Sequence, residues 1–222
     1  MLSLISNIGG TGKTFVYLCL TYLLRGRSKK CASVAWTGIA ATLLPEGRTC
    51  HHTFGIPPTS LNRESRSTLN PKSEKAKDLI QTDIILWDEV PMSPGDALSL
   101  VDLLLQDLMK NNLPFGGKTI IMGGDFRQVT PVIPHASKAQ IIESSVKSSD
   151  LWQKFRVLKL KKNQRVEEGA QDYADWLLKL GEKRLPILSG TEDTIELPDK
   201  VVCRGDIIEE VIIICENNNS NF

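Results

Sequence analysis

The chain has 222 residues, of which 41% are hydrophobic and 24% are charged, a balance typical of a folded domain rather than a disordered segment. The formal net charge is +1, so a nucleic-acid partner would need a local patch or backbone amides rather than bulk positive charge. No apolar run reaches the ~18–20 residues that cross a bilayer, and we expect no membrane association. The five cysteines include no C-x-x-C pair, which argues against a zinc site and favours reduced thiols.

Short apolar runs alternate along the chain with longer stretches of helical spacing. The run Leu2–Ser6 ends at a Gly-Gly turn and predicts a buried strand. The apolar stretch Lys13–Leu24 contains no Gly or Pro and predicts a helix that is buried on most sides. Further strands are expected at Ser33–Trp36, Ile84–Trp87, Thr119–Met122 and Val157–Leu160, and further helices at Gly38–Leu44, Ala97–Met109 and Tyr173–Leu180. This alternation predicts an α/β fold with a parallel sheet flanked by helices.

Polar segments set the expected domain organisation. Residues 57–75 are rich in Pro, Ser, Asn and charge and predict a loop. We expect residues 1–198 to form one domain and residues 199–222, which end in a polar run of low complexity, to be a disordered tail. The basic cluster at residues 25–30 is interpreted as a solvated helix end rather than a nuclear-import signal, because cations are favourable at helix C-termini.

The segment GGTGKT lies between the first predicted strand and the first predicted helix, which is the context of a phosphate-binding P-loop. Glycines let backbone amides approach phosphate oxygens, and the helix N-terminus adds the positive end of its dipole. The Lys13 ammonium can reach the β- and γ-phosphates, and the Thr14 hydroxyl can bind Mg²⁺. We therefore expect ATP and Mg²⁺ to bind at Gly9, Gly10, Thr11, Gly12, Lys13 and Thr14.

One position departs from the full P-loop pattern. The pattern G-x-x-x-x-G-K-[ST] places its first glycine at position 7, where this chain has Asn7. Asparagine tolerates a left-handed backbone better than most residues, so the loop can still close. We expect a lower nucleotide affinity than with glycine, and Asn7→Gly should tighten ATP binding.

The second motif is an acidic pair. Asp88 and Glu89 come directly after the predicted strand Ile84–Trp87. In P-loop NTPases the first acid holds Mg²⁺, and the next glutamate can act as a general base on the attacking water. Exposed acids at a strand end are common, so this motif is weak alone and gains its meaning from the P-loop. The adjacent pair favours hydrolysis over phosphoryl transfer to a small molecule.

Two polar residues after later strands are further candidates. Gln128 could sense the γ-phosphate, and Arg165 could stabilise the charge that develops on the transferred phosphoryl group. Taken singly, each is more simply an exposed polar residue.

Together these motifs resemble the petite-integration-frequency (PIF) DNA helicases and their Helitron-transposon relatives in helicase superfamily 1. The matching blocks cover most of residues 4–187: GGTGKTF, TGIAATLLPEGRTCHHTFGIP, ILWDEVPM, GGDFRQVTPVIP, FRVLKLKKNQR and YADWLLKLGE. The second and fourth blocks are long and specific, which argues against a kinase or an AAA-type ATPase. The resemblance implies a RecA-like domain of an ATP-dependent DNA helicase. The family couples ATP hydrolysis to 5′-to-3′ movement along single-stranded DNA in DNA repair, recombination and telomere maintenance.

The resemblance also implies a role for each motif in nucleotide chemistry. The Walker A pair is Lys13–Thr14, and the Walker B acids are Asp88 and Glu89. Gln128 matches the γ-phosphate-sensing glutamine, and Arg165 matches an arginine that contacts the γ-phosphate. By the same resemblance Glu89, Gln128 and Arg165 are the catalytic candidates, and Thr14 and Asp88 the metal ligands.

A separate set of residues is expected to face single-stranded DNA by resemblance: Thr37, Gly38 and the segment His51–Phe54. Hydroxyl, imidazole and aromatic groups do contact phosphates and stack on bases. From the residues alone, the alternative that His51 and Phe54 pack locally under a loop is favoured.

The chain departs from the family pattern in two places. No upstream adenine-contacting glutamine motif and no second-domain blocks are found. We therefore expect nucleotide binding with slow turnover and no unwinding by this chain alone. The alternative is a truncated, transposon-derived remnant that binds nucleotide or DNA without unwinding. The resemblance favours the nucleus, with mitochondrion or cytoplasm as alternatives, and the sequence indicates no protein partner.

Overall fold

The computed structural model describes residues 1–7, 10–58, 61–127, 137–164, 171–182, 184–190 and 194–197. The chain divides into two compact units, Met1–Glu168 and Gly169–Phe222. The predicted boundary at residue 198 and the tail 199–222 lie outside the described residues, so that division of the chain stays a prediction.

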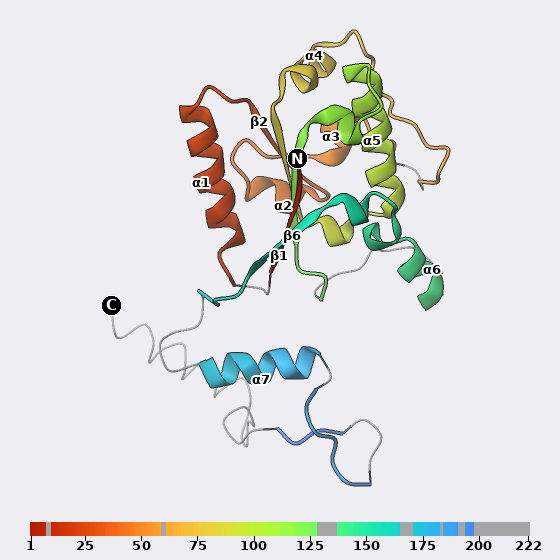
Figure 1. The fold of residues 1–222 in the computed structure, drawn as a ribbon. Helices are drawn as coiled ribbons and strands as arrows, with labels where there is room; N and C mark the ends of the chain where they lie inside the picture. The colour runs from red at the N-terminus through yellow and green to blue at the C-terminus, as the bar shows by residue number, and fades with distance from the viewer. Residues whose placement is uncertain are drawn as a thin grey trace. The chain divides into compact units, whose positions relative to one another are not determined.

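The first unit is built on a six-stranded sheet in which every strand pair is parallel (Figure 1). The strand order is β3-β2-β4-β5-β1-β6. The strands are β1 (Leu2–Asn7), β2 (Cys31–Ala35), β3 (Arg48–Thr49), β4 (Ile84–Asp88), β5 (Thr119–Gly124) and β6 (Arg156–Leu160). The predicted parallel α/β fold is confirmed, and all five predicted strands are present within a few residues. The short edge strand β3 was not predicted.

Helices connect the strands of the first unit. They are α1 (Lys13–Gly26), α2 (Gly38–Thr42), α3 (Cys50–Phe54), α4 (Glu74–Gln81), α5 (Gly95–Met109) and α6 (Lys138–Glu143). Single 3₁₀ turns occur at Val90–Met92, Pro114–Gly117, Val146–Ser148 and Trp152–Lys154. The predicted loop at residues 57–75 overlaps the start of α4, which Ser73 caps by accepting a hydrogen bond from the Ala76 N–H.

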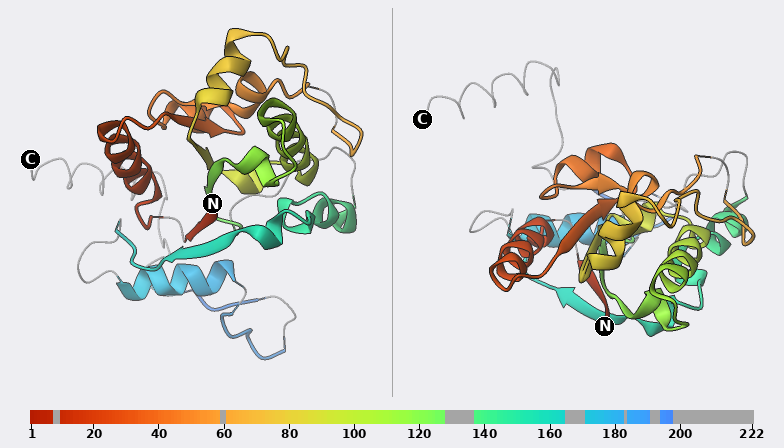
Figure 2. Two further views of the ribbon diagram at one scale, coloured as in Figure 1. Left: turned by 45° about the horizontal axis from the view of Figure 1, so that its top comes forward. Right: turned by 90° about the horizontal axis from the view of Figure 1, so that it is seen from above.

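The two faces of the sheet bury alternate residues of the same strands. Side chains of α1 and α2 pack with Ile5, Leu86 and Ile121 on one face. Side chains of α3, α4 and α5 pack with Leu4, Ile85, Trp87, Ile120 and Met122 on the other. Figures 1 and 2 show α1 and α5 on opposite sides of the strands. Because both faces are covered, the central strands are apolar throughout.

Helix α1 is less buried than its composition suggested. Its buried residues are Tyr17 and Thr21, which lie one turn apart, whereas Phe15, Tyr22 and Leu23 are 70%, 63% and 53% exposed. The expectation that this helix is buried on most sides is therefore wrong. One side of the helix contacts the sheet, where the partly buried Val16 and Leu20 pack beside Tyr17 and Thr21.

The second unit contains α7 (Gln171–Gly181), which confirms the predicted helix at Tyr173–Leu180. Tyr173 and Trp176 stack on this helix with ring centroids 5.9 Å apart, and Ile187 forms an antiparallel bridge with Ile195. None of the helices in the described parts of the chain is long and apolar enough to span a membrane.

Candidate active site at the carboxyl ends of the strands

The turn between β1 and α1 has the backbone that the glycine-rich motif predicts. Gly10 and Gly12 both have φ of +84°, a left-handed conformation that favours glycine. Gly12 is the N-cap residue of α1, and no side chain caps this end of the helix or places an acid in its first turn. The first N–H groups of α1 are therefore available for a phosphate. Gly9 and the side chain of Asn7 lie outside the described residues.

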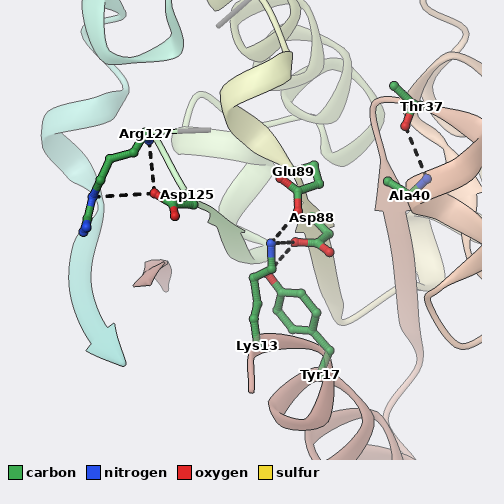
Figure 3. Close-up of polar contacts among 8 residues, drawn as sticks. All are labelled: Lys13, Tyr17, Thr37, Ala40, Asp88, Glu89, Asp125 and Arg127. Carbon is green, nitrogen blue, oxygen red and sulfur yellow. Dashed lines mark hydrogen bonds and ion pairs between the residues drawn. The ribbon is translucent and has the colours of Figure 1, made fainter. Parts of the chain in front are cut away.

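Strand β4 delivers two carboxylates to the same edge of the sheet. The Lys13 Nζ lies 2.8 Å from Asp88 Oδ1 and 2.8 Å from Glu89 Oε1 (Figure 3). Burial alone would lower the pKa of Lys13, but the two carboxylates outweigh it and raise the pKa above its usual value. The ammonium is therefore charged and sits between the two predicted acids. These three residues are brought together as the motifs predicted.

Glu89 leaves the strand with an unusual backbone. Its φ of 49° and ψ of 41° are left-handed, which is uncommon for a residue with a long side chain. Asp88 is 5% exposed, whereas the Glu89 side chain is 28% exposed. The turn thus directs one acid into the protein and leaves the other partly open to water.

Tyr17 is a member of this site that sequence reasoning missed. Its hydroxyl donates to Asp88 Oδ1 at 3.4 Å, and its side chain is fully buried (Figure 3). Burial raises the pKa of Tyr17 well above its usual value, and the nearby Asp88 carboxylate adds to this effect, so the phenol stays protonated. Its spacing of four residues from Lys13 could have indicated that both side chains share one face of α1.

Strand β5 ends at the same place with Gly123, Gly124 and the buried Asp125. Asp125 Oδ1 accepts a hydrogen bond from the Arg127 N–H at 3.0 Å and lies 3.8 Å from Arg127 Nε (Figure 3). A Cβ on Gly124 would lie 2.2 Å from Pro91 Cδ, so glycine permits the close approach of β5 to the turn after β4. The predicted sensor Gln128 lies outside the described residues.

A cavity of about 580 Å³ opens over these groups. It is lined by the P-loop, the ends of β4 and β5, α2 and the chain after β6: Gly10, Gly12, Lys13, Thr14, Thr37, Ile39, Ala40, Leu43, Asp88, Glu89, Met92, Asp125 and Gln164. A larger cavity of about 670 Å³ near α5 and α6 is lined mainly by serines and acids and contains none of these motifs. Chemistry rather than volume therefore identifies the site.

Gln164 is a second residue that was not predicted. Its backbone N–H donates to the Gly10 carbonyl oxygen at 2.8 Å, which ties the segment after β6 to the P-loop. The adjacent Arg165 lies outside the described residues.

Oxygen donors suited to Mg²⁺ line the cavity. Thr14 and Asp88 both line it, and a cation, the Lys13 ammonium, already contacts the Asp88 carboxylate. No group of three or more His, Cys, Asp or Glu side chains with metal-binding geometry occurs among the described residues. This donor set fits Mg²⁺, which is commonly held by one or two protein ligands together with phosphates and water.

Thr37 and Gly38, two of the residues expected to face DNA, lie at the start of α2. Thr37 caps this helix, because its Oγ1 accepts a hydrogen bond from the Ala40 N–H at 3.3 Å (Figure 3). Gly38 is the first residue of the helix and is exposed. Thr37 lines the cavity, so the start of α2 can contact a ligand there.

The expected DNA residues of α3 differ in accessibility. His51 is half-buried, its ring centroid is 4.5 Å from that of Trp36, and burial lowers its pKa. Phe54 is fully buried and packs against Trp87 with centroids 5.8 Å apart. The expectation for Phe54 is corrected, because its ring belongs to the core and offers no face to a base.

Comparison of the sequence with known protein families agrees with the geometry of this site. The sequence model of the PIF1-like helicases matches residues 3–189. The chain belongs to the PIF1-like helicase family. The matched region contains the P-loop, both acids and the carboxyl ends of all six strands.

Proteins named as ATP-dependent DNA helicases are similar to this PIF1-like chain. Pif1 of a Psychrobacter species is 33% identical over 129 residues, which cover 58% of this chain and 19% of that protein. Pif1 of Bdellovibrio bacteriovorus is 30% identical over 166 residues, which cover 72% of this chain and 36% of that protein. RRM3 of Saccharomyces cerevisiae is 31% identical over 129 residues, 55% of this chain and 17% of that protein. This chain thus spans about a third or less of these relatives.

Solved PIF1 structures have the same fold as this chain. Bacteroides Pif1 bound to single-stranded DNA superposes with a TM-score of 0.70 at 27% identity, over 83% of this chain and 43% of that chain. Bacteroides Pif1 in complex with ADP-AlF3 and single-stranded DNA gives a TM-score of 0.71 at 23% identity, over 100% and 54% of the two chains. The second likeness shows the fold alone.

Proposed function

We propose that this chain is the ATP-binding part of an ATP-dependent DNA helicase, which couples ATP hydrolysis to movement along single-stranded DNA. The observation that carries the proposal is the Lys13 ammonium held between Asp88 and Glu89 at the mouth of a cavity beside the P-loop turn. Together these groups supply a phosphate cradle, a site for a divalent cation and a base for water. Family membership and the ADP-AlF4 complex of Bacteroides sp Pif1, which is 28% identical to this chain, support ATP as the ligand.

The nucleotide reaction assigns one task to each residue. The open N–H groups of α1 and the Lys13 ammonium bind the phosphates. Thr14 and Asp88 hold Mg²⁺, which neutralises phosphate charge when it is bound. Glu89 accepts a proton from the attacking water. Because Lys13 now contacts Glu89, its transfer to the phosphates would free this carboxylate for that role.

Gln128 and Arg165 complete the proposed catalytic set. Gln128 is proposed to sense the γ-phosphate, and Arg165 to stabilise charge in the transition state. The hydrogen bond from Gln164 to Gly10 supports the assignment of Arg165, because the preceding residue already contacts the P-loop.

Single-stranded DNA is the proposed polymer substrate. Thr37, which lines the cavity, the exposed Gly38 and the half-buried His51 are proposed to contact the DNA. The Bacteroides Pif1 complex with single-stranded DNA supports this partner. The 5′-to-3′ direction, the roles in DNA repair, recombination and telomere maintenance, and a nuclear location are proposed from the family alone. Mitochondrion and cytoplasm are the alternative locations.

ATP hydrolysis by the purified chain, measured with and without single-stranded DNA, tests the proposal. Lys13→Ala and Glu89→Gln should abolish turnover, whereas Lys72→Ala, an exposed lysine in the loop before α4, should leave it unchanged. Slow turnover that rises with DNA would support a working ATPase and a DNA site. Failure to bind nucleotide would overturn the proposal.

DNA-stimulated ATP turnover, rather than strand displacement, separates the two functional alternatives. We expect no unwinding by the chain alone. Nucleotide or DNA binding without DNA-stimulated turnover would favour the transposon-derived remnant over the helicase.

A further inference from the structure

One oxygen of Asp88 is contacted by two side chains of the same helix. Asp88 Oδ1 lies 2.8 Å from Lys13 Nζ and accepts a hydrogen bond from the Tyr17 hydroxyl at 3.4 Å. Residues 13 and 17 are four apart on α1, so both side chains project from one face of the helix toward β4. Figure 3 shows Lys13 and Tyr17 rising from α1 to this carboxylate.

The neighbouring strand β5 makes room for the phenol. A Cβ on Gly123 would lie 1.8 Å from the Tyr17 hydroxyl oxygen and 3.0 Å from Tyr17 Cζ. Gly123 does not have a positive φ, so its backbone would accept an L-residue without strain. Glycine is therefore required at position 123 for steric reasons, because the Tyr17 hydroxyl occupies the space that a Cβ would need.

We propose that Tyr17 is a positioning residue for the carboxylate of Asp88, and that Gly123 is its matched partner. The inference rests on the proposed function, in which Lys13 turns toward the phosphates when nucleotide binds. Tyr17 is then the donor left on Oδ1, because its ring is locked between α1 and β5. Asp88 keeps its orientation, and its second oxygen stays available to the cation.

The competing explanation is that Tyr17 simply fills the core. Its ring does pack in the cluster with Ile5, Ala35 and Leu86. Phenylalanine would fill that space equally well, and burying a hydroxyl is unfavourable unless it is hydrogen-bonded. The hydroxyl also requires a glycine on β5. A side chain that only packs in the core needs neither a hydroxyl nor a glycine opposite it, so removal of the oxygen alone distinguishes the two explanations.

Mg²⁺ dependence of nucleotide binding is the direct test. The full chain would be titrated with a fluorescent ADP analogue at increasing Mg²⁺, comparing Tyr17→Phe with Tyr22→Phe. Tyr22 lies on the same helix and is 63% exposed, so it is a matched control. We expect Tyr17→Phe to raise the Mg²⁺ concentration at half-saturation by about 5- to 10-fold. Affinity in EDTA should change by less than about 2-fold, since a hydrogen bond to Asp88 does not touch the phosphate cradle.

The outcomes distinguish this inference from the proposed function. Identical Mg²⁺ dependence in the unaltered chain and Tyr17→Phe would overturn the positioning role and leave ATP binding intact. Absence of nucleotide binding by the unaltered chain would overturn both.

A double-mutant cycle tests the match between Tyr17 and Gly123. Gly123→Ala should lower the Tm by about 4–8 °C, because the added Cβ cannot coexist with the hydroxyl. In the Tyr17→Phe background, Gly123→Ala should lower the Tm by less than about half as much, because the hydroxyl oxygen that the Cβ would meet is absent. Equal losses in both backgrounds would overturn the matched pair.

Discussion

The left-handed backbone of Glu89 makes a sharp prediction about stability. Glu89→Gly and Glu89→Ala both remove the carboxylate and its ion pair with Lys13, so they differ mainly in the backbone. At φ 49° and ψ 41°, alanine retains a steric cost of about 1–2 kcal/mol that glycine avoids. Glycine loses about 0.4–1 kcal/mol through the greater freedom of its unfolded chain. The glycine variant should therefore be more stable than the alanine variant by roughly 0.5–1 kcal/mol.

Urea unfolding of the nucleotide-free protein measures this difference. Lys77 supplies a matched pair, because it is exposed in the middle of α4. There the order should reverse, with Lys77→Ala more stable than Lys77→Gly by about 1 kcal/mol. An alanine variant at least as stable as the glycine variant at position 89 would refute the reasoning.

Substitutions of Glu89 should affect ATP turnover and folding stability differently. Glu89→Gln keeps the strained backbone and a side chain of the same size, yet it should lose turnover, as should the glycine and alanine variants. Such a result would mean that strain is retained because the carboxylate is needed at this point of the turn.

Three further predictions concern other parts of the first unit. Gly116 has φ 61°, and a Cβ there would lie 2.3 Å from the Leu105 carbonyl oxygen, so Gly116→Ala should destabilise the protein by about 3 kcal/mol in thermal melts. Burial lowers the pKa of Lys118, so the unfolded chain binds more protons just below the usual lysine pKa and stability should rise with pH there. Urea titrations at about pH 8 and about pH 10 should show that rise reduced in Lys118→Met. Thr37 accepts a hydrogen bond from the Ala40 N–H, so Thr37→Val should cost about 1 kcal/mol in urea and Thr37→Ser much less.

The central strands could be predicted because consecutive residues in them are apolar. Strands β4 and β5 are covered on both faces, so each reads as an unbroken apolar run that ends where the polar site begins. Short elements carry less of this signal. Strand β3 has two residues, which is too few for either periodicity to show, and α3 was missed although α2, of the same five-residue length, was predicted from the run Gly38–Leu44.

Apolar content also misled where the direction of a side chain mattered. Helix α1 contains enough large hydrophobic residues to suggest general burial, but the sheet contacts only the side of the helix that carries Tyr17 and Thr21, together with Val16 and Leu20. In the sequence, the exposed Phe15 and Leu23 cannot be distinguished from core residues, because they are equally apolar. Only the packing of the helix on the sheet distinguishes the two faces.

The meeting of Lys13, Asp88 and Glu89 followed from topology, since the carboxyl ends of parallel strands share one edge of the sheet. The contributions of Tyr17 and Gln164 did not follow, because they depend on approaches between segments far apart in sequence. Tyr17 reaches Asp88 across 71 positions, and Gln164 reaches Gly10 through its backbone, which no side-chain pattern reveals.

The site concentrates features that each oppose local stability. Lys13 is a charge whose side chain is 11% exposed, Glu89 has a left-handed backbone, and Gly123 leaves a buried strand without a side chain. They occur together at the ends of adjacent strands, around one carboxylate, Asp88. Departures from local preference that converge on one group are expected where chemistry rather than folding selects the residues. The same convergence favours a role for Tyr17 and Gly123 in the site in addition to the packing of the Tyr17 ring in the core.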